Sequence, residues 1–540
     1  MQKSILIRQA RVLDGTGAPW FESDVLIQDG RIAAIGRGLA VTGAQVVHAA
    51  GQYLAPGFID VHTHDEFAQL RDPARPEKVY QGITTVVTGN CGFSLFPAQP
   101  GTEDAVQELN ASLHGPIDAD EILPDCARFR ERLAEAPAAI NTVAQVGHGT
   151  LRATVMGFTD REASPAEMAQ MTDLLHMQIR QGACGLSLGL MYSPSMYAPR
   201  AELVALARVV AQCDALLTVH LRDYSSRLLE SLDEFLSIVA EAGCKALVSH
   251  LQVTGRNNWG AMPVALARLE TARRQGIDVS FDMYPYLAGS TSILQLLPAH
   301  WQSDGAEGIL RRLADPQQCA MLRDWLEQPA NDLSKVTQIG WGSIWIGDAA
   351  SPEFPDAPGR SLRDLATLRG THDPFPLFVS LIRASQGQAS VILFQQEEKD
   401  LNLALGHRLH MVGSDSIPRC QGHVHPRIYG SFPRFVRKAL DGRDGALEDG
   451  IRRITALPAQ RFGLWERGII RTGAIADLVL FSQAVADRAT FELPRLFPQG
   501  IDSVWVAGEA ILQAGEPTGK YPGRLLFSPH PHPHSTQGAL

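Results

Sequence analysis

Apolar and polar residues alternate in short runs at both ends of the chain. SILIRQARVLDGTG (4–17) and SDVLIQDGRIAAIG (23–36) lie near the beginning, and SVWVAGEAI (503–511) lies near the end. Alternation with a period of two, interrupted by glycines, is typical of β-strands with one buried face. We therefore predict one small β-sandwich domain formed by both ends of the chain, residues 1–56 and 466–525.

The middle of the chain, residues 57–465, alternates between β-like and helical patterns. Helical stretches such as 165–181 and 262–275 lie between most of the β-like runs, which are residues 58–64, 84–90, 141–148, 185–192, 216–222, 246–252, 278–286 and 409–416. Eight strands that alternate with helices predict an α/β fold, a TIM-like (β/α)8 barrel. The gap of about 120 residues between the last two runs is too long for one crossover, so we expect an inserted subdomain at about 290–400.

Composition narrows the class of protein. The 540 residues are 45% hydrophobic and 20% charged, which suits a large buried core. The net charge of −10 argues against a nucleic-acid or membrane partner, and no apolar run approaches the ~18 residues of a membrane helix. The chain has no signal-peptide pattern at its N-terminus and no C-x-x-C pair among its seven cysteines, which favours a reducing compartment. We expect a cytoplasmic enzyme with a small-molecule substrate and a flexible Pro/His-rich tail, 526–540; these patterns do not predict its oligomeric state.

Two histidines stand at the end of the first β-like run of the middle region. His62 and His64 are separated by one residue in PGFIDVHTHDE. On a strand, such side chains point to the same face, and at the C-terminal end of a barrel strand that face is the mouth where active sites form. The pair is therefore a candidate metal chelate.

Further metal-compatible residues stand at the ends of other predicted strands. They are Cys91, His220, His250 and Asp415. Each alone is more typical of a packed side chain, but their recurrence at the same strand ends indicates a shared site. A thiolate together with imidazoles favours zinc.

The motif set resembles the amidohydrolase superfamily, and within it the N-acyl-D-amino-acid deacylase (D-aminoacylase) branch. The resemblance covers nearly the whole chain and rests on PGFIDVHTHDE, GITTVVTGNCGFS, GACGLSLGLMYSP, HLRD, SHLQVTGR, FDMYPYLAGST, MVGSDSIP and HPRIYGSFPR. It implies zinc-dependent hydrolysis of N-acyl-D-amino acids to a carboxylate and a free D-amino acid.

The resemblance also implies roles for the candidate residues. Cys91, His220 and His250 would hold one tight zinc ion, and a second, weaker ion would be held by His62 and His64, sharing Cys91. Asp415 would be the general base and then the general acid. Many two-metal members of the superfamily carry a bridging lysine on the fourth strand, but GLSLGLMY contains none, and no lysine falls at a predicted barrel mouth.

Substrate contacts follow from the same motifs. Arg427 matches the arginine that the family uses for the substrate α-carboxylate, and Tyr284, Tyr192 and Ser290 are further candidates. Gln252 departs from the family pattern, because a lysine usually stands there and an amide carries no charge. The natural substrate is therefore either an N-acyl-D-amino acid held without that lysine, or another N-acyl amine or a different linear or cyclic amide.

Two other interpretations remain open from the sequence. Ser187 lies in a G-x-S-x-G pattern, which is also found at the nucleophile of serine hydrolases, but that reading leaves the metal-compatible residues unexplained. His148 ends the third β-like run, where it either orients the substrate carbonyl or is a structural histidine. A catalytically inactive barrel is disfavoured, because all expected metal ligands are present.

Overall fold

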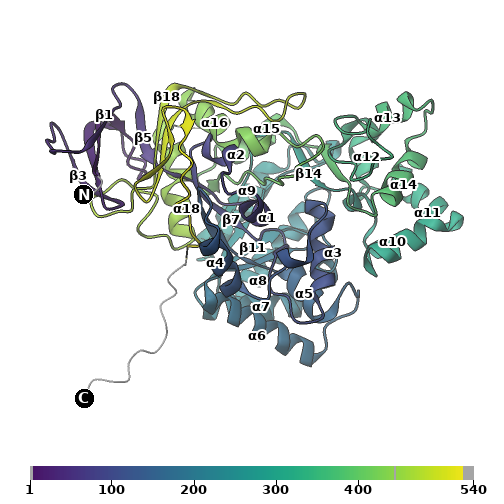
Figure 1. Cartoon of the computed structure of the whole chain (residues 1–540). Coiled ribbons are helices and arrows are strands. Elements are labelled where there is room, and N and C mark those ends of the chain that lie inside the picture. Colours follow the sequence, from purple (N-terminus) through teal and green to yellow (C-terminus); the bar gives the residue numbers. More distant parts are fainter. Residues whose placement is uncertain (1–3, 443–445, 527–540) are drawn as a thin grey trace, which may run out of the picture.

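Both ends of the chain contribute strands to one sheet in the computed structural model, which describes residues 4–442 and 446–526. Strand β5 pairs with β1 on one side and with β18 on the other, so it joins the two ends of the chain (Figure 1). The nine strands are β1 (Ser4–Val12), β2 (Phe21–Gln28), β3 (Arg31–Gly36), β4 (Gln45–His48), β5 (Tyr53–Pro56), β18 (Leu478–Ala486), β19 (Gln499–Val506), β20 (Glu509–Gln513) and β21 (Glu516–Pro517). Where the sequence predicts a sandwich, hydrogen bonds connect all nine strands into a single sheet.

Parallel strands form the centre of the molecule. One sheet contains β6 (Phe58–Asp60), β7 (Ile83–Thr88) and β8 (Asn141–Ala144); a second contains β9 (Val146–Gly147), β10 (Gly185–Gly189), β11 (Leu216–His220), β12 (Lys245–Val248), β13 (Val279–Asp282) and β17 (His410–Met411). Main-chain bonds join the two sheets at both edges: Cys184 N donates to Ala144 O (2.8 Å), and Asp415 N donates to His62 O (2.8 Å). The C-terminal ends of these strands consequently share one face.

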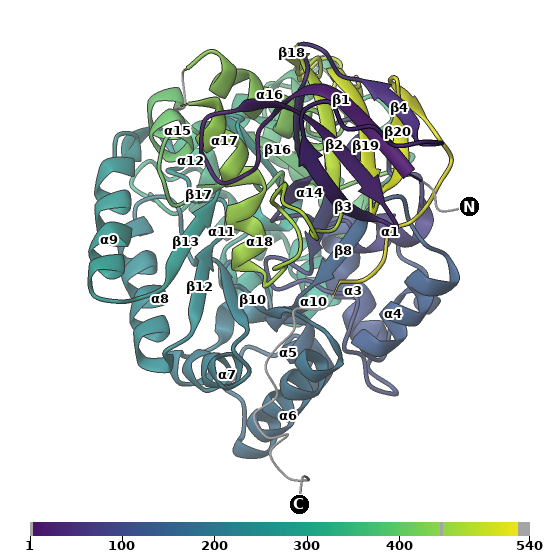
Figure 2. The same ribbon diagram turned by 90° about the vertical axis from the view of Figure 1, so that its left-hand side faces the viewer.

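Amphipathic helices cover the outside of the parallel strands. In α7, Leu203, Leu206, Ala207 and Val210 are buried, at the spacing of three or four that places them on one helix face. Figure 2 shows α7, α8 and α9 outside β10, β12 and β13. The helices up to this point are α1 (Glu66–Arg71), α2 (Pro76–Val79), α3 (Glu103–His114), η1 (Ala119–Glu121), α4 (Cys126–Glu135), α5 (His148–Met156), α6 (Pro165–Gln181), η2 (Ser195–Tyr197), α7 (Arg200–Gln212), α8 (Leu228–Ala242), η3 (Arg256–Asn258) and α9 (Met262–Arg274).

A long segment between β13 and β17 has a sheet and an apolar cluster of its own. Its strands β14 (Ala288–Ser292), β15 (Ile344–Ile346) and β16 (Ser390–Phe394) pair antiparallel. Its helices are η4 (Ile293–Leu296), η5 (Ala299–Trp301), α10 (Gly305–Ala314), α11 (Pro316–Glu327), α12 (Lys335–Ile339), η6 (Trp341–Ser343), α13 (Leu362–Leu368) and α14 (Pro374–Ala384). Figure 1 shows α10 to α14 at the opposite end of the molecule from β1 and β3.

Four helices remain in the described part of the chain. The first, α15 (Glu398–Leu405), precedes β17. The other three, α16 (Arg427–Leu440), α17 (Leu447–Ile454) and α18 (Ala456–Arg461), connect β17 to β18, and α16 packs on β18. Among the described residues, no helix is both long and apolar enough to cross a membrane. The predicted tail, residues 526–540, lies outside the described residues except for Leu526.

Candidate metal centre

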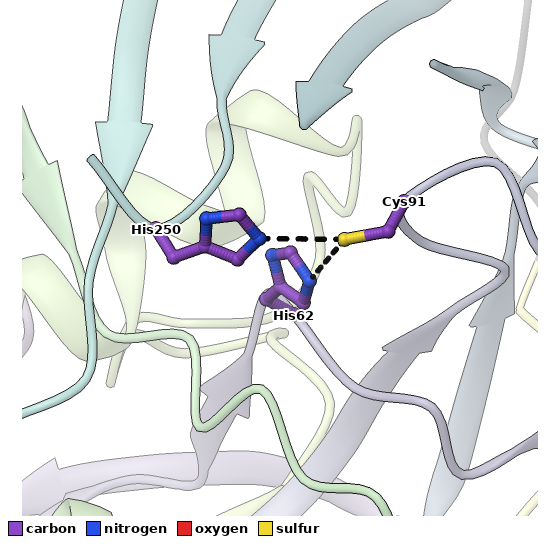
Figure 3. A group of neighbouring side chains, drawn as sticks. All are labelled: His62, Cys91 and His250. Atoms are coloured by element: carbon purple, nitrogen blue, oxygen red, sulfur yellow. Dashed lines mark hydrogen bonds between the residues drawn. The ribbon is translucent and has the colours of Figure 1, made fainter. Parts of the chain in front are cut away.

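His62 stands two residues after the end of β6, and a carboxylate contacts the rear of its ring. His62 Nδ1 lies 3.2 Å from Asp282 Oδ2, at the end of β13, and both side chains are fully buried. This contact leaves His62 Nε2 facing Cys91 Sγ at 3.3 Å (Figure 3). A carboxylate behind a ring nitrogen is the usual way in which a metal-binding histidine is oriented.

Cys91 contacts two imidazoles. It follows β7 in the left-handed backbone region (φ 53°), and its Sγ lies 3.4 Å from His250 Nε2, on the same side of the sulfur as His62 (Figure 3). Burial raises the pKa of the Cys91 thiol to about 11 in the absence of a cation. The three side chains converge from three different strand ends, so their ligand atoms lie within 4.8 Å of one another.

Asp415 joins the same cluster from the segment that follows β17. Its Oδ1 lies 3.4 Å from His64 Nε2 and 3.5 Å from His62 Nε2, and its Oδ2 lies 2.8 Å from Arg427. Burial disfavours the carboxylate, but Arg427 and the histidines outweigh it and hold the pKa of Asp415 well below its ordinary value. The carboxylate is therefore ionised at neutral pH.

His220 lies beside this cluster and not within it. Its ring centroid is 4.5 Å from that of His250, but the His220 nitrogens belong to neither group of converging ligand atoms. Both of its ring nitrogens are buried without a hydrogen-bond partner among the described residues. Burial lowers the pKa of His220, and it lowers that of His250 to about 4, so both rings are neutral, which is the form that binds metals.

Four residues that the sequence patterns did not identify support the site: Asp60, Lys78, Asp282 and Ser416. Asp282 accepts a hydrogen bond from His250 N (2.9 Å) besides orienting His62. It lies within the seventh β-like run, where a search for carboxylates that orient metal-binding histidines would find it. Lys78 Nζ contacts Asp60 Oδ2 (2.8 Å) and Ser416 Oγ (2.8 Å), which fastens the chain beside Asp415 to β6. Nothing local in the sequence indicates that α2 reaches this point.

A third cluster adjoins His64. Its ligand atoms come from His64, Glu66 and His114, all buried, and the Glu66 oxygens have no hydrogen-bond partner among the described residues. Burial raises the pKa of Glu66 to about 8 and lowers that of His114. Glu66 stands two residues after His64, whereas His114 comes from the end of α3 with no motif to mark it.

The residues predicted to contact substrate surround a small cavity next to the cluster. Tyr192, Gln252, Tyr284 and Ser290 line it together with His64, His220, His250 and Asp415. Tyr284 Oη donates to Gln252 Oε1 at 3.3 Å. Arg427 lies behind this wall, with its guanidinium 4.7 Å from the Tyr284 ring centroid and one nitrogen donating to Ser290 O at 3.2 Å.

Ser187 and His148, which the sequence offered as alternative functional residues, make contacts away from the metal centre. Ser187 Oγ donates to Gly89 O (2.5 Å) and accepts from Gly92 N (3.1 Å), so it braces main chain in the protein interior. His148 Nε2 lies 2.8 Å from Glu202, and its Nδ1 lies 2.9 Å from Ser195 Oγ. Neither Ser187 nor His148 lines the cavity beside Asp415.

Comparison with known proteins identifies relatives across nearly the full length. A sequence model described as the amidohydrolase family matches residues 45–274 and 357–512. The chain is 35% identical to an N-acyl-D-aspartate deacylase and 34% identical to a D-aminoacylase, both of Alcaligenes xylosoxydans xylosoxydans, covering 99% and 97% of this chain and 97% of each relative. It also superposes with a TM-score of 0.82, at 33% identity, on the crystal structure of an N-acyl-D-glutamate deacylase from Bordetella bronchiseptica complexed with zinc and a phosphonate mimic of the tetrahedral intermediate, covering 98% of this chain and 100% of that one.

Proposed function

Because this chain belongs to the amidohydrolase family, we propose that it hydrolyses the amide bond of N-acyl-D-amino acids, giving a carboxylate and a free D-amino acid. The observation that carries the proposal is Cys91 in contact with His62 and His250, beside a buried, ionised Asp415. Full-length similarity to deacylases of this substrate class supports it.

We assign the chain to a (β/α)8 barrel with two additions. The barrel spans 57–465, the small β domain comprises 1–56 and 466–525, and the inserted subdomain covers about 290–400. The main-chain bonds at both edges of the central sheets support a closed barrel, and the separate apolar cluster between β13 and β17 supports the inserted subdomain.

The cluster is chemically suited to zinc. It combines a thiol, imidazoles and a carboxylate, and buried nitrogens of His64, His220 and His250 have no hydrogen-bond partner among the described residues. We propose that Cys91, His220 and His250 hold one tight ion and that His62 and His64, sharing Cys91, hold a second, weaker one. Zinc bound in such a site acts as a Lewis acid, which polarises a carbonyl oxygen and lowers the pKa of water.

Asp415 then moves the proton. Its ionised Oδ1 accepts a proton from the attacking water and later donates it to the leaving amine nitrogen. Arg427 holds Oδ2, so the carboxylate keeps one orientation while Oδ1 changes its protonation state. His62 stays in place because Asp282 anchors its ring.

The cavity wall supports recognition of a carboxylate-bearing substrate. Arg427 lies against Tyr284 and Ser290, and we propose that these three residues hold the α-carboxylate, with Tyr192 on the acyl side. Gln252 favours a second candidate function, hydrolysis of N-acyl amines that lack a carboxylate, because an uncharged amide there already bonds Tyr284.

Amine release from matched substrates tests the proposal. Zinc-loaded and chelator-treated protein would be compared on N-acetyl-D-amino acids, their L-enantiomers and N-acetyl amines without a carboxylate. Chelator-sensitive turnover restricted to D-amino acids is the expected result. Turnover of only the carboxylate-free amides would retain the metal chemistry and reject the amino-acid substrate.

A further inference from the structure

A buried lysine from the inserted segment faces the cavity beside the metal centre. Lys335, the first residue of α12, is 8% exposed and lines that cavity together with Gln252 and Tyr284. The helix carrying it packs against η3, which follows β12. The lysine therefore reaches the site from a part of the chain remote from every strand end, where no sequence pattern pointed to a lysine.

The Lys335 ammonium has only neutral hydrogen-bond partners. Its Nζ donates to Thr254 Oγ1 at 3.1 Å and to Gln338 Oε1 at 3.3 Å. In the part of the chain that the structure describes, no carboxylate lies within ion-pair distance of Nζ, and Asp223 acts on it only from farther away. A buried cation without a counter-ion is costly, so this ammonium is disposed to take up an anion.

The other charged residues around the cavity do not provide a counter-ion for the Lys335 ammonium. Among the described lining residues Lys335 is the only lysine or arginine, and Asp415 is the only carboxylate. Arg427, behind the wall, is already paired with Asp415 at 2.8 Å. Gln252 contributes no charge. Arg222, which lines a second pocket together with Lys335, is paired with Glu234 at 2.9 Å.

We propose that Lys335 is a specificity-determining residue that pairs with a carboxylate of the substrate, supplying from the inserted segment the positive charge that Gln252 lacks. The inference rests on the proposed function, because it assumes a substrate whose scissile carbonyl lies at the metal centre. The carboxylate is either the α-carboxylate common to all N-acyl amino acids or the side-chain carboxylate of an acidic one. Both present the same anion, and matched substrates distinguish them.

The test uses zinc-loaded protein and three substrates: N-acetyl-D-leucine, N-acetyl-D-glutamate and the neutral N-acetyl-D-leucinamide. Lys335→Met is expected to raise KM about tenfold or more for a carboxylate substrate, with little change in kcat and no change for the neutral amide. An effect on both acids assigns Lys335 to the α-carboxylate, and an effect on the glutamate derivative alone assigns it to the side chain. Equal effects on all three substrates, or none, would overturn the proposal.

Three further variants separate a binding role from a structural one. Gln252→Lys in the Lys335→Met background is expected to recover part of the lost affinity, because it returns a cation to the adjacent wall. Lys335→Arg keeps the charge and covers the case in which Lys335→Met fails to fold. Lys245→Met is the matched control, since Lys245 lies at the beginning of β12, where it is 40% exposed and paired with Asp214.

Equilibrium binding of the substrates to wild type and Lys335→Met tests the role of Lys335 separately from the proposed deacylase function. Wild-type turnover of the two acids decides the function. The role of Lys335 is decided by how much Lys335→Met weakens binding of each acid, compared with binding of N-acetyl-D-leucinamide. A wild-type protein that does not hydrolyse the acids but binds them through Lys335 would refute only the function. Equal affinities of wild type and variant for both acids would refute the inference even in an active deacylase.

Discussion

At the scale of single residues, the Asp415–Arg427 pair determines how a proton is moved. Arg427 occupies Oδ2 and holds the pKa of Asp415 far below neutrality, so Oδ1 is free to accept a proton. An arginine predicted only as a substrate contact therefore also orients the general base. This second role follows from a 2.8 Å contact that the sequence does not reveal.

Replacement of Asp415 by asparagine tests its role as base. The amide has nearly the same shape but cannot accept and return a proton, so Asp415→Asn is expected to lower kcat by about 100-fold or more. Zinc content measured by mass spectrometry should remain close to that of the wild type. Retention of most of the activity would show that another group moves the proton.

Cys91 offers the corresponding test of the metal centre. Cys91→Ala removes the sulfur that contacts both His62 Nε2 and His250 Nε2, and we expect a clear loss of bound zinc and of turnover. Cys126→Ala is the matched control, because Cys126 is equally buried but lies in α4, away from the site. If both variants bound zinc like the wild type, Cys91 would not be a ligand.

The sequence locates residues that stand at strand ends but not those that reach the site from elsewhere. His62, His64, Cys91, His250 and Asp415 converge in the structure, because parallel strands bring their C-terminal ends to one face. The residues that no local pattern could place arrive from helices: Lys78 from α2, His114 from α3 and Lys335 from α12. Their positions depend on tertiary packing.

At the scale of elements, β-like runs overestimate strand length where the chain turns toward the site. The last run, 409–416, contributes only β17, His410–Met411, because the residues after it bend to present Asp415 at φ 50°. The third run divides into β8 and β9, and His148 begins α5. Apolar periodicity cannot mark these points, since the residues stay buried after the strand has ended.

The contact between α5 and α7 gives a pH-dependent prediction. Burial disfavours the Glu202 carboxylate, but His148 and Arg152 outweigh it and lower the pKa of Glu202 below its ordinary 4.5. A lowered acid pKa stabilises the fold above pH 4.5, and this stabilisation is lost as the pH falls through the folded-state value.

Urea unfolding of wild type and Glu202→Gln measures this effect. The difference in free energy of unfolding is expected to be largest at neutral pH and to decline below pH 4.5. Arg152→Met should give a similar profile, because Arg152 contacts the other Glu202 oxygen at 2.6 Å. A difference that does not vary with pH would mean that the Glu202 charge contributes nothing to stability.

At the scale of the whole molecule, the substrate cavity is built from two parts of the fold. The central strands supply the metal-compatible residues, and the segment between β13 and β17 supplies Ser290, Thr291 and Lys335 to the opposite wall. The chemistry can thus stay fixed on the central strands while the inserted segment sets which substrates fit. The length of the gap between the last two β-like runs predicts that such a segment exists. The sequence pattern does not predict which of its residues face the cavity.

Zinc-dependent deacylation is tested most directly by a zinc titration of metal-free protein, followed by turnover of N-acetyl-D-leucine and N-acetyl-L-leucine. We expect no activity before zinc is added and a rise that is essentially complete at about one equivalent per chain, for the D-enantiomer only. Full activity in the metal-free protein would contradict the role given to Cys91 and the histidines. Equal turnover of the two enantiomers would contradict the substrate class.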